Sequence, residues 1–289
     1  MTWIAEIIQG ILLGGLFSLF ACGLSLLFGV MEVINLAHGD IAVVAAYLAV
    51  VLVPAVHIPA LWSFVIIVPV FAVGGYVLQR GLLQPSLDSG PISTLLVTFG
   101  LSVVLENVLL EVFTANSHSL QIGSLVSDSF RLSGQISIGY LSLVIFGVAL
   151  VVLVALQLFL SRAPTGRLIR AVADDREAAQ LAGADYRHLF GIAAGLAFAT
   201  VALAGLALGM YSSIDPTAGT TYLLYAFEAV VIGGLGSLWG TLAGGIVLGL
   251  ATTLGARVDP NLGSLLPHLV FLAVLAVRPR GLFPKRVEA

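Results

Sequence analysis

Long runs without a charged side chain limit the folds open to this sequence. Residues 7–31 and residues 41–79 contain no Asp, Glu, Lys or Arg. A helix of about 20 mostly apolar residues is long enough to cross the hydrocarbon core of a bilayer. Charged residues make up 9% of the chain, whereas they make up roughly 25% of a soluble domain. We therefore predict an all-α polytopic membrane protein, and its single cysteine, Cys22, excludes a disulfide within the chain.

Basic residues set the orientation of the predicted segments, because Lys and Arg in short loops favour the cytoplasm. They concentrate in residues 162–187 and 278–286, so both stretches are expected in the cytoplasm. The chain must then cross an even number of times between them, and we divide residues 223–256 at the Gly-Gly-Leu-Gly-Ser sequence of residues 233–237. Parity predicts about nine transmembrane helices and an outside N-terminus, and eight or ten stay open if a short segment does not cross. The segments are residues 4–30, 41–53, 61–79, 92–112, 138–160, 189–210, 223–232, 238–256 and 265–277.

Two polar breaks in the apolar pattern resemble each other at an offset of 180 residues. By parity, the helix before the first break runs inward and the helix before the second runs outward, which predicts an inverted internal repeat as in many transporters. The identities are few, and chance similarity is the alternative. We expect one membrane domain over residues 1–289, with repeats at about residues 4–112 and 188–278, a linking helix at 138–160 and a charged loop at 161–187. The matching positions are Gly29, Ile34, Asn35 and Gly39, and then Gly209, Ile214, Asp215 and Gly219.

Polar residues near the two breaks are candidates for lining a transport pathway, since polar backbone at membrane depth is tolerated where it lines a cavity or is buried in protein. Asn35 and His38 have apolar neighbours, which favours a buried role. A lone histidine in such a place is more often a hydrogen-bonded packing residue than a proton relay. For the two aspartates, which lie at segment edges, a surface loop is an equally good interpretation. The pathway candidates are Asn35, His38, Asp40, Asp215, Thr217 and Glu106.

Two glutamates fall within or beside predicted membrane segments. A carboxylate at the centre of a membrane helix costs about 2.5–3.5 kcal/mol on the insertion scale, so Glu106 would have to face the bundle interior or a water-filled cavity. The alternative, which the spacing to Glu111 slightly favours, is that Glu106 lies near its helix end and reaches the membrane surface. For Glu228, the same two interpretations apply, and a position near a helix end is again slightly favoured.

Glycines recur every four residues at Gly236, Gly240 and Gly244, which would put them on one helix face and allow a neighbouring helix to approach closely. We expect them to serve helix packing. No Gly-x4-Gly-Lys-Ser/Thr sequence is present, so the chain is not expected to hydrolyse ATP through a P-loop. The sequence offers no paired metal ligands and no catalytic motif, so no metal or cofactor is expected, and a net charge of −3 gives no reason to expect nucleic acid.

The charged loop carries a candidate docking helix. Residues 167–182 are good helix formers, with acidic residues near the start and a glycine as a stop signal. The sequence resembles the EAA loop of ABC importer permeases, whose coupling helix docks into a groove on the ATPase subunit, and the later apolar-Pro part of that pattern is absent. The alternative is a solvated amphipathic loop. The docking candidates are Arg176, Glu177, Ala178, Ala179 and Gly183.

Three further stretches extend the resemblance over essentially the whole chain, namely residues 28–40, 228–245 and 278–283. Together they are similar to the branched-chain, or hydrophobic, amino-acid ABC permeases, and the length resembles the shorter of the two paired permeases in such systems. The resemblance implies ATP-driven import of Leu, Ile, Val or related amino acids across the bacterial inner membrane. It also implies a second homologous permease, two cytoplasmic ATPases and a periplasmic or lipid-anchored binding protein. Related systems carry urea or short amides.

A second class of transporter stays open at this point. An ion- or proton-coupled secondary transporter could use Glu106 or Asp40 to carry the proton. An intramembrane enzyme, by contrast, has no catalytic constellation in the sequence to support it.

Overall fold

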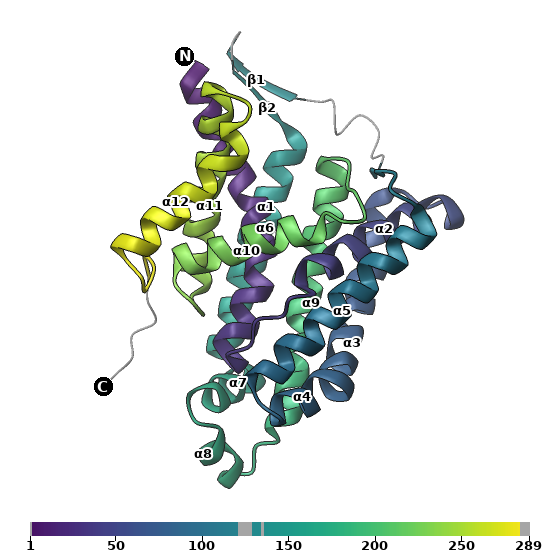
Figure 1. Ribbon diagram of the computed structural model, residues 1–289, viewed down its shortest axis with the longest axis vertical. Helices are drawn as coiled ribbons and strands as arrows, with labels where there is room; N and C mark the ends of the chain where they lie inside the picture. Colours follow the sequence, from purple (N-terminus) through teal and green to yellow (C-terminus); the bar gives the residue numbers. More distant parts are fainter. Residues whose placement is uncertain (1, 121–128, 134–135, 284–289) are drawn as a thin grey trace.

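The computed structural model describes residues 2–120, 129–133 and 136–283, and this part of the chain is almost entirely helical (Figure 1). Two short antiparallel strands precede helix α6. The helices are α1 (Thr2–Met31), α2 (His38–Val56), the 3₁₀ helix η1 (Ala60–Trp62), α3 (Ser63–Leu78), the π-helix η2 (Gln79–Leu83), α4 (Gln84–Asp88), α5 (Pro91–Phe113), α6 (Tyr140–Arg162), α7 (Pro164–Asp174), α8 (Arg176–Leu181), α9 (Tyr186–Tyr211), α10 (Gly219–Gly233), α11 (Leu238–Val258) and α12 (Leu262–Val277), and the strands are β1 (Ser129–Ser133) and β2 (Ile136–Gly139).

Seven helical stretches in the described part of the chain are long and apolar enough to cross a membrane. One of them runs through η1, α3, η2 and α4 as a continuous stretch, Ala60–Asp88. Two shorter apolar helices, α10 and α12, complete the set. These elements overlap the nine expected segments, although the third continues to Asp88, beyond its expected end at residue 79, and the structure confirms an all-α polytopic membrane protein.

The core of the molecule lies around α1 and α9, which are buried along most of their length, whereas most residues of α5 and α6 are exposed or half-buried. Both central helices are rich in small residues, which let neighbouring backbones approach closely within a membrane. A Cβ at Gly10 or Gly14 would collide with α11, and a Cβ at Gly191 or Gly195 would collide with α3. Close glycine contacts therefore fix α1 on α11 and α9 on α3.

The two halves repeat this packing in opposite directions. Gly10 and Gly14 recur as Gly191 and Gly195, 181 residues later, and each pair faces an antiparallel neighbour. In Figure 1, α1 runs from the N-terminal end of the molecule toward α7, whereas α9 starts near α8 and runs back. In addition, α10 packs on α1 while α2 packs on α9. This exchange of partners is the arrangement that an inverted repeat produces.

Three local expectations are corrected by the structure. The first break is shorter than residues 31–40: α2 begins at His38, so Gly39 and Asp40 also lie in its first turn. The charged loop holds two helices instead of one over residues 167–182, because Asp175 adopts an extended backbone between α7 and α8 and caps the second. Gly236 lies in the turn before α11, with φ of 77°, and is not on the helix face of Gly240.

Candidate functional site

The two polar breaks meet where the first turns of α2 and α10 cross. Gly39 begins this contact on α2, and Gly219, its counterpart at the offset of 180, completes it on α10. A Cβ added to Gly39 would overlap the carbonyl of Gly219, and a Cβ added to Gly219 would overlap the Asp40 carboxylate. The first turns of α2 and α10 are therefore in backbone contact, and only glycine leaves enough room for it.

Asn35 and His38 are enclosed by the subunit, with 0% of each residue exposed. The Asn35 Oδ1 accepts a hydrogen bond from the N–H of Ala37 at 3.0 Å and so closes the turn before α2. The His38 Nε2 donates to the carbonyl oxygen of Phe20, in the middle of α1, at 2.8 Å. Both side chains hold the first break against α1 in this conformation, and a role in lining a pathway stays a prediction.

Asp40 links α2 to α5. The residue is 1% exposed, and Ser102 donates a short hydrogen bond of 2.5 Å to its Oδ2. Its Oδ1 has no hydrogen-bond partner among the described residues and lies against Gly219. Glu106 follows Ser102 by one turn of α5 and is half-buried. The structure thus brings together two of the predicted pathway residues, and Ser102, which the sequence analysis did not single out, joins them.

The second break is held by a segment far away in the sequence. Ile214 and His118 exchange two backbone hydrogen bonds, at 3.0 and 2.8 Å, so the segment after α5 pairs with the segment after α9. The hydroxyl of Tyr47, on α2, donates to the carbonyl oxygen of Ile214 at 2.8 Å. Asp215 and Thr217 are exposed beside this bridge. They are therefore not enclosed like their counterparts in the first break.

Glu228 is buried inside the subunit. The interpretation that its side chain lies near a helix end and reaches the membrane surface was therefore wrong. Its side chain is 2% exposed and its Oε1 lies 2.6 Å from the Nδ1 of His268 on α12. The ring of His268 stacks on Tyr225, one turn before Glu228, with 5.5 Å between ring centres. Forty residues separate Glu228 and His268, and no local sequence signal connects them. The pair joins α10 to α12.

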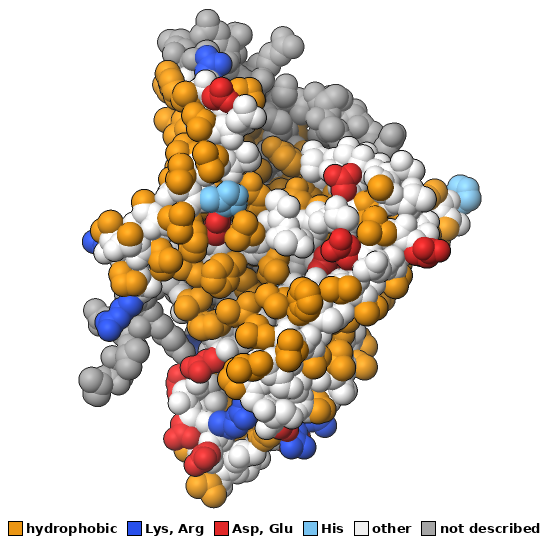
Figure 2. All heavy atoms as spheres, viewed as in Figure 1, with side chains coloured by type: hydrophobic (Ala, Val, Ile, Leu, Met, Phe, Trp, Pro, Cys, Tyr) orange, Lys and Arg blue, Asp and Glu red, His pale blue; other side chains and the backbone are white. Residues whose placement is uncertain are grey.

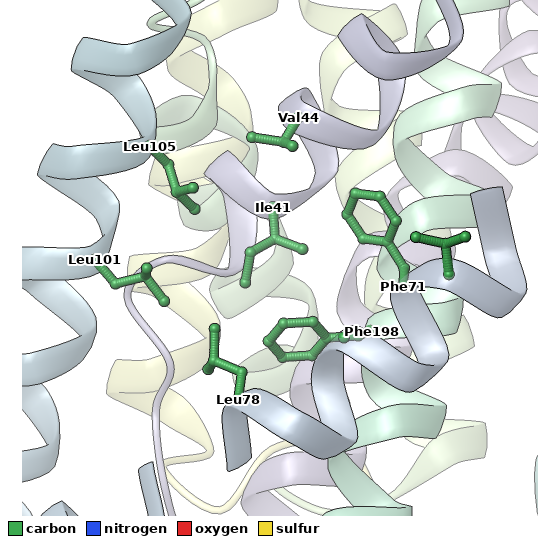
Figure 3. A pocket seen from close by; sticks show the side chains of 9 residues that line it. Ile41, Val44, Phe71, Leu78, Leu101, Leu105 and Phe198 are labelled. Atoms are coloured by element: carbon green, nitrogen blue, oxygen red, sulfur yellow. The ribbon is translucent and has the colours of Figure 1, made fainter. Parts of the chain in front are cut away.

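An apolar cavity of about 210 Å³ lies between α2, α3, α5 and α9 (Figure 3). Its lining includes Ile41, next to Asp40, and two leucines that flank Ser102 and Glu106 along α5. Apolar side chains alone form its walls, so a hydrophobic group is the chemistry that it would accept. The labelled side chains in the figure, which converge on the cavity, are Ile41, Val44, Phe71, Leu78, Leu101, Leu105 and Phe198.

The candidate docking helix α8 projects from the end of the molecule opposite the N-terminus (Figure 1). Asp175 caps it by accepting from the N–H of Ala178 at 2.9 Å, and Gly183 ends the turn after it with φ of 90°. Glu177 and Ala178 are exposed, whereas Ala179 faces the core. Leu181 is 91% exposed and carries the most exposed large apolar side chain described in the structure. The sequence analysis missed Leu181, although it lies within the candidate helix.

Arg176 is turned toward its own subunit. Its guanidinium lies 4.8 Å from the ring centre of Tyr186 and 5.0 Å from that of Phe190, both on the first turns of α9. Such a cation–π contact contributes about 0.5–1 kcal/mol at an exposed site. Arg176 therefore fastens the start of α8 to α9 and leaves the outer face of α8 to Glu177, Ala178 and Leu181.

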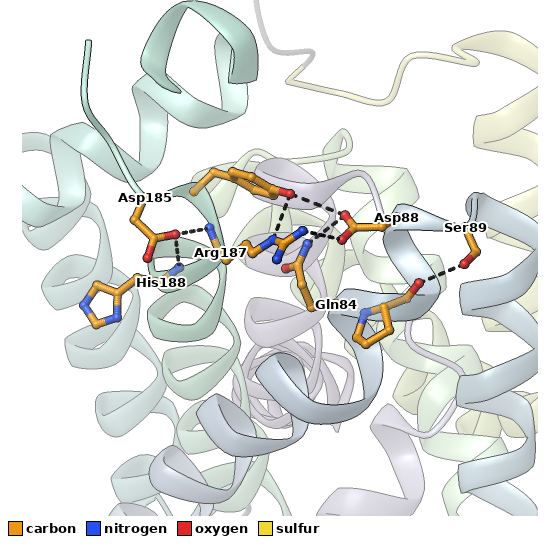
Figure 4. A network of polar contacts seen from close by, with 8 residues as sticks. Gln84, Asp88, Ser89, Asp185, Arg187 and His188 are labelled. Atoms are coloured by element: carbon orange, nitrogen blue, oxygen red, sulfur yellow. Dashed lines mark hydrogen bonds and ion pairs between the residues drawn. The ribbon is translucent and has the colours of Figure 1, made fainter. Parts of the chain in front are cut away.

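A polar network ties the start of α9 to the end of α4 (Figure 4). Arg187 forms an ion pair with Asp88, with 3.1 Å between Nη2 and Oδ2. Gln84 donates to the other oxygen of Asp88 at 3.1 Å, and Asp185 caps α9 by accepting from the N–H groups of Arg187 and His188. The loop that contains α8 is thus anchored to α4 as well as to α9.

Comparisons with known proteins agree with this architecture. Residues 6–275 match the family described as branched-chain amino acid transport system / permease component. The chain is 28% identical to the high-affinity branched-chain amino acid transport system permease protein BraD of Pseudomonas aeruginosa, over 97% of this chain and 95% of that protein. It is 26% identical to the corresponding protein LivH of Escherichia coli, over 98% and 96% of the two chains.

Among solved structures, the chain resembles PsaBC from Streptococcus pneumoniae in complex with Fab. The TM-score is 0.50 at 13% sequence identity, over 96% of this chain and 97% of that one. At this identity the likeness concerns the fold. The family match spans most of the sequence, and the chain therefore belongs to the branched-chain amino acid transport system permease family.

Proposed function

We propose that the chain is a membrane-spanning subunit of an ATP-driven importer of branched-chain amino acids. Family membership supports transport, and the names of BraD and LivH support the substrate class. ATP hydrolysis would lie on two cytoplasmic ATPases, and a second permease and an extracytoplasmic binding protein would complete the assembly. The α8 end of the molecule and the C-terminus would face the cytoplasm, in agreement with the excess of Arg at residues 162–187 and 278–286.

The observation that carries the proposal is the exposed face of α8. Leu181 lies at the tip of a charged loop, and its apolar side chain is 91% exposed. Such a side chain is suited to bind in a pocket of a partner protein. Ala179 packs into the subunit from the other side of the same helix, so a force on α8 would reach α9 through a packed contact. Arg187 and Asp88 would pass that force to the α3–α4 stretch. Helix α3 packs on α2, so the force would continue to the contact between α2 and α10.

Co-purification with the ATPase tests the docking role. We expect Leu181→Asp and Glu177→Lys to remove the ATPase from the purified complex, with a loss of affinity of at least about tenfold, because a central interface side chain contributes about 2 kcal/mol or more. Val258→Asp, which changes a side chain of 69% exposure at the other end of the molecule, is the matched control. Normal ATPase retention by both α8 variants, with unchanged thermal unfolding, would contradict the docking role.

Energy coupling separates this proposal from ion-coupled transport. In proteoliposomes that contain the assembled complex, uptake of leucine should require ATP and should survive an uncoupler that collapses the proton gradient. Uptake that stops when the gradient collapses while ATP is held constant would favour a secondary transporter. Competition by isoleucine and valine, compared with urea and acetamide, would define the substrate class.

A further inference from the structure

A second cavity, of about 260 Å³, lies at the α8 end of the molecule and has no part in the proposed function. It is far larger than the 10–15 Å³ that a single water needs. Helices α1, α6 and α7 and the start of α11 form its walls, so it lies between the membrane bundle and the charged loop. Its polar side chains are those of Ser25, Gln157, Arg170 and Ser237, and the first residues of α11, Leu238 and Trp239, also line it.

The start of α11 presents hydrogen-bond donors to this cavity. The first N–H groups of a helix have no acceptor within the helix, and α11 is 21 residues long. Ser237 takes up one of them, since its Oγ accepts from the N–H of Gly240 at 3.1 Å, and its carbonyl oxygen accepts the first regular bond of the helix, from the N–H of Thr241 at 2.8 Å. The N–H groups of Leu238 and Trp239 come before these in the helix, and both residues line the cavity. Together with the helix dipole, they favour an anion.

Ser25 gives an independent sign of a ligand. It is 1% exposed, lines the cavity, and its hydroxyl has no hydrogen-bond partner among the described residues. Buried polar groups nearly always have a partner. Ser18, two turns earlier on the same helix, follows that rule by donating to the carbonyl oxygen of Gly14 at 2.6 Å. The hydroxyl of Ser25 is therefore available to a group inside the cavity.

Charge and geometry select the kind of ligand. Arg170 is the one charged side chain among the residues that line the cavity, and no carboxylate lines it. Asp174, one turn further along α7, is exposed and does not belong to the lining. A guanidinium and a helix N-terminus both suit a phosphate group, which accepts several hydrogen bonds at once. Gln157 adds an amide that can donate as well.

We propose that this cavity binds a phosphate group, from a phospholipid headgroup or from free phosphate, and that Ser25, Arg170 and the N-terminus of α11 hold it. The ligand would join α7, which belongs to the charged loop, to α1 and α11 in the bundle. Its binding would therefore stabilise the loop in the position seen here.

Thermal unfolding of the full-length chain in detergent tests the site. The chain is titrated with inorganic phosphate, with dihexanoyl phosphatidylglycerol, and with sodium chloride at matched ionic strength. At least one phosphate-bearing probe should raise the unfolding midpoint saturably above the chloride series. An effect of inorganic phosphate identifies a free-phosphate site, and an effect of the lipid alone identifies a headgroup site.

Two variants and one control decide whether the cavity is responsible. Arg170→Gln and Ser25→Ala should each raise the half-saturating concentration, and for Arg170→Gln the increase should be at least about tenfold, since a hydrogen bond to a charged group is lost. Arg167→Gln, on the same helix but outside the lining, should leave it unchanged. No stabilisation by either probe beyond chloride would overturn the proposal, and so would equal stabilisation of wild type and Arg170→Gln.

Discussion

Gly183 ends the turn after α8 in a backbone conformation that other residues avoid. Its φ is 90°, and a Cβ there would meet no atom within 4 Å, so the cost of a side chain comes from the backbone alone. We expect Gly183→Ala to destabilise the turn by about 1–2 kcal/mol and to lower ATP-coupled uptake. Gly100→Ala, at a helical position that also has open space, should be neutral. Hydrogen exchange of the loop would detect the effect, and equal exchange in both variants would contradict it.

Glu228 and His268 form a polar pair in which the Glu228 side chain is 2% exposed, and the effects of replacing the two residues should not be additive. Loss of His268 leaves the Glu228 carboxyl group buried without this hydrogen-bond partner, which costs about 1–3 kcal/mol. His268→Leu should therefore lower the free energy of unfolding strongly, because Glu228 is 2% exposed. Adding Glu228→Leu should restore a large part of this loss. A double-mutant cycle by chemical denaturation in detergent measures the coupling, and additive effects would refute it.

At the scale of elements, the crossing of α2 and α10 depends on two glycines. Gly39→Ala and Gly219→Ala each place a methyl group on backbone or carboxylate atoms of the opposite helix. Overpacking of a tight contact costs about 1–3 kcal/mol, and we expect both variants to lose stability and transport. Gly147→Ala on α6, where a Cβ meets nothing within 4 Å, is the control and should be neutral. If Gly39→Ala and Gly219→Ala unfold as the wild-type protein does, the two helices do not approach each other this closely.

The sequence was sufficient to predict most of these elements but not their side-chain partners. Charge-free runs identify membrane helices because hydrocarbon excludes charge, and the parity argument divided residues 223–256 where α10 and α11 separate. The partners of Asp40 and Glu228 could not be predicted, because Ser102 and His268 reach them through tertiary packing across 62 and 40 residues. Gly236 was misplaced because a four-residue spacing does not show where a helix begins.

At the scale of the whole molecule, the two halves exchange equivalent contacts around the Gly39–Gly219 crossing. Helix α2 packs on α9 and helix α10 packs on α1, so a rotation of one half of the chain against the other changes the surroundings of both breaks together. A loop anchored to α4 and to α9 through Arg187 contacts both halves. We therefore expect movement of α8 to act on the relative position of the repeats and not on one break alone.

This arrangement requires the two ends of the molecule to face opposite sides of the membrane. Cys22 is fully buried, so Cys22→Ser gives a background without reactive thiols into which single cysteines can be placed. An impermeant maleimide should label Leu181→Cys from the cytoplasmic side, and His57→Cys and Arg257→Cys from the opposite side. The expectation rests on the directions of the helices, since α1 and α11 are antiparallel neighbours. The hydroxyl of Thr253 donates to the carbonyl oxygen of Glu6 at 3.1 Å, so the end of α11 lies beside the start of α1. Labelling of Leu181→Cys and Arg257→Cys from the same side would exclude the predicted number of crossings between them.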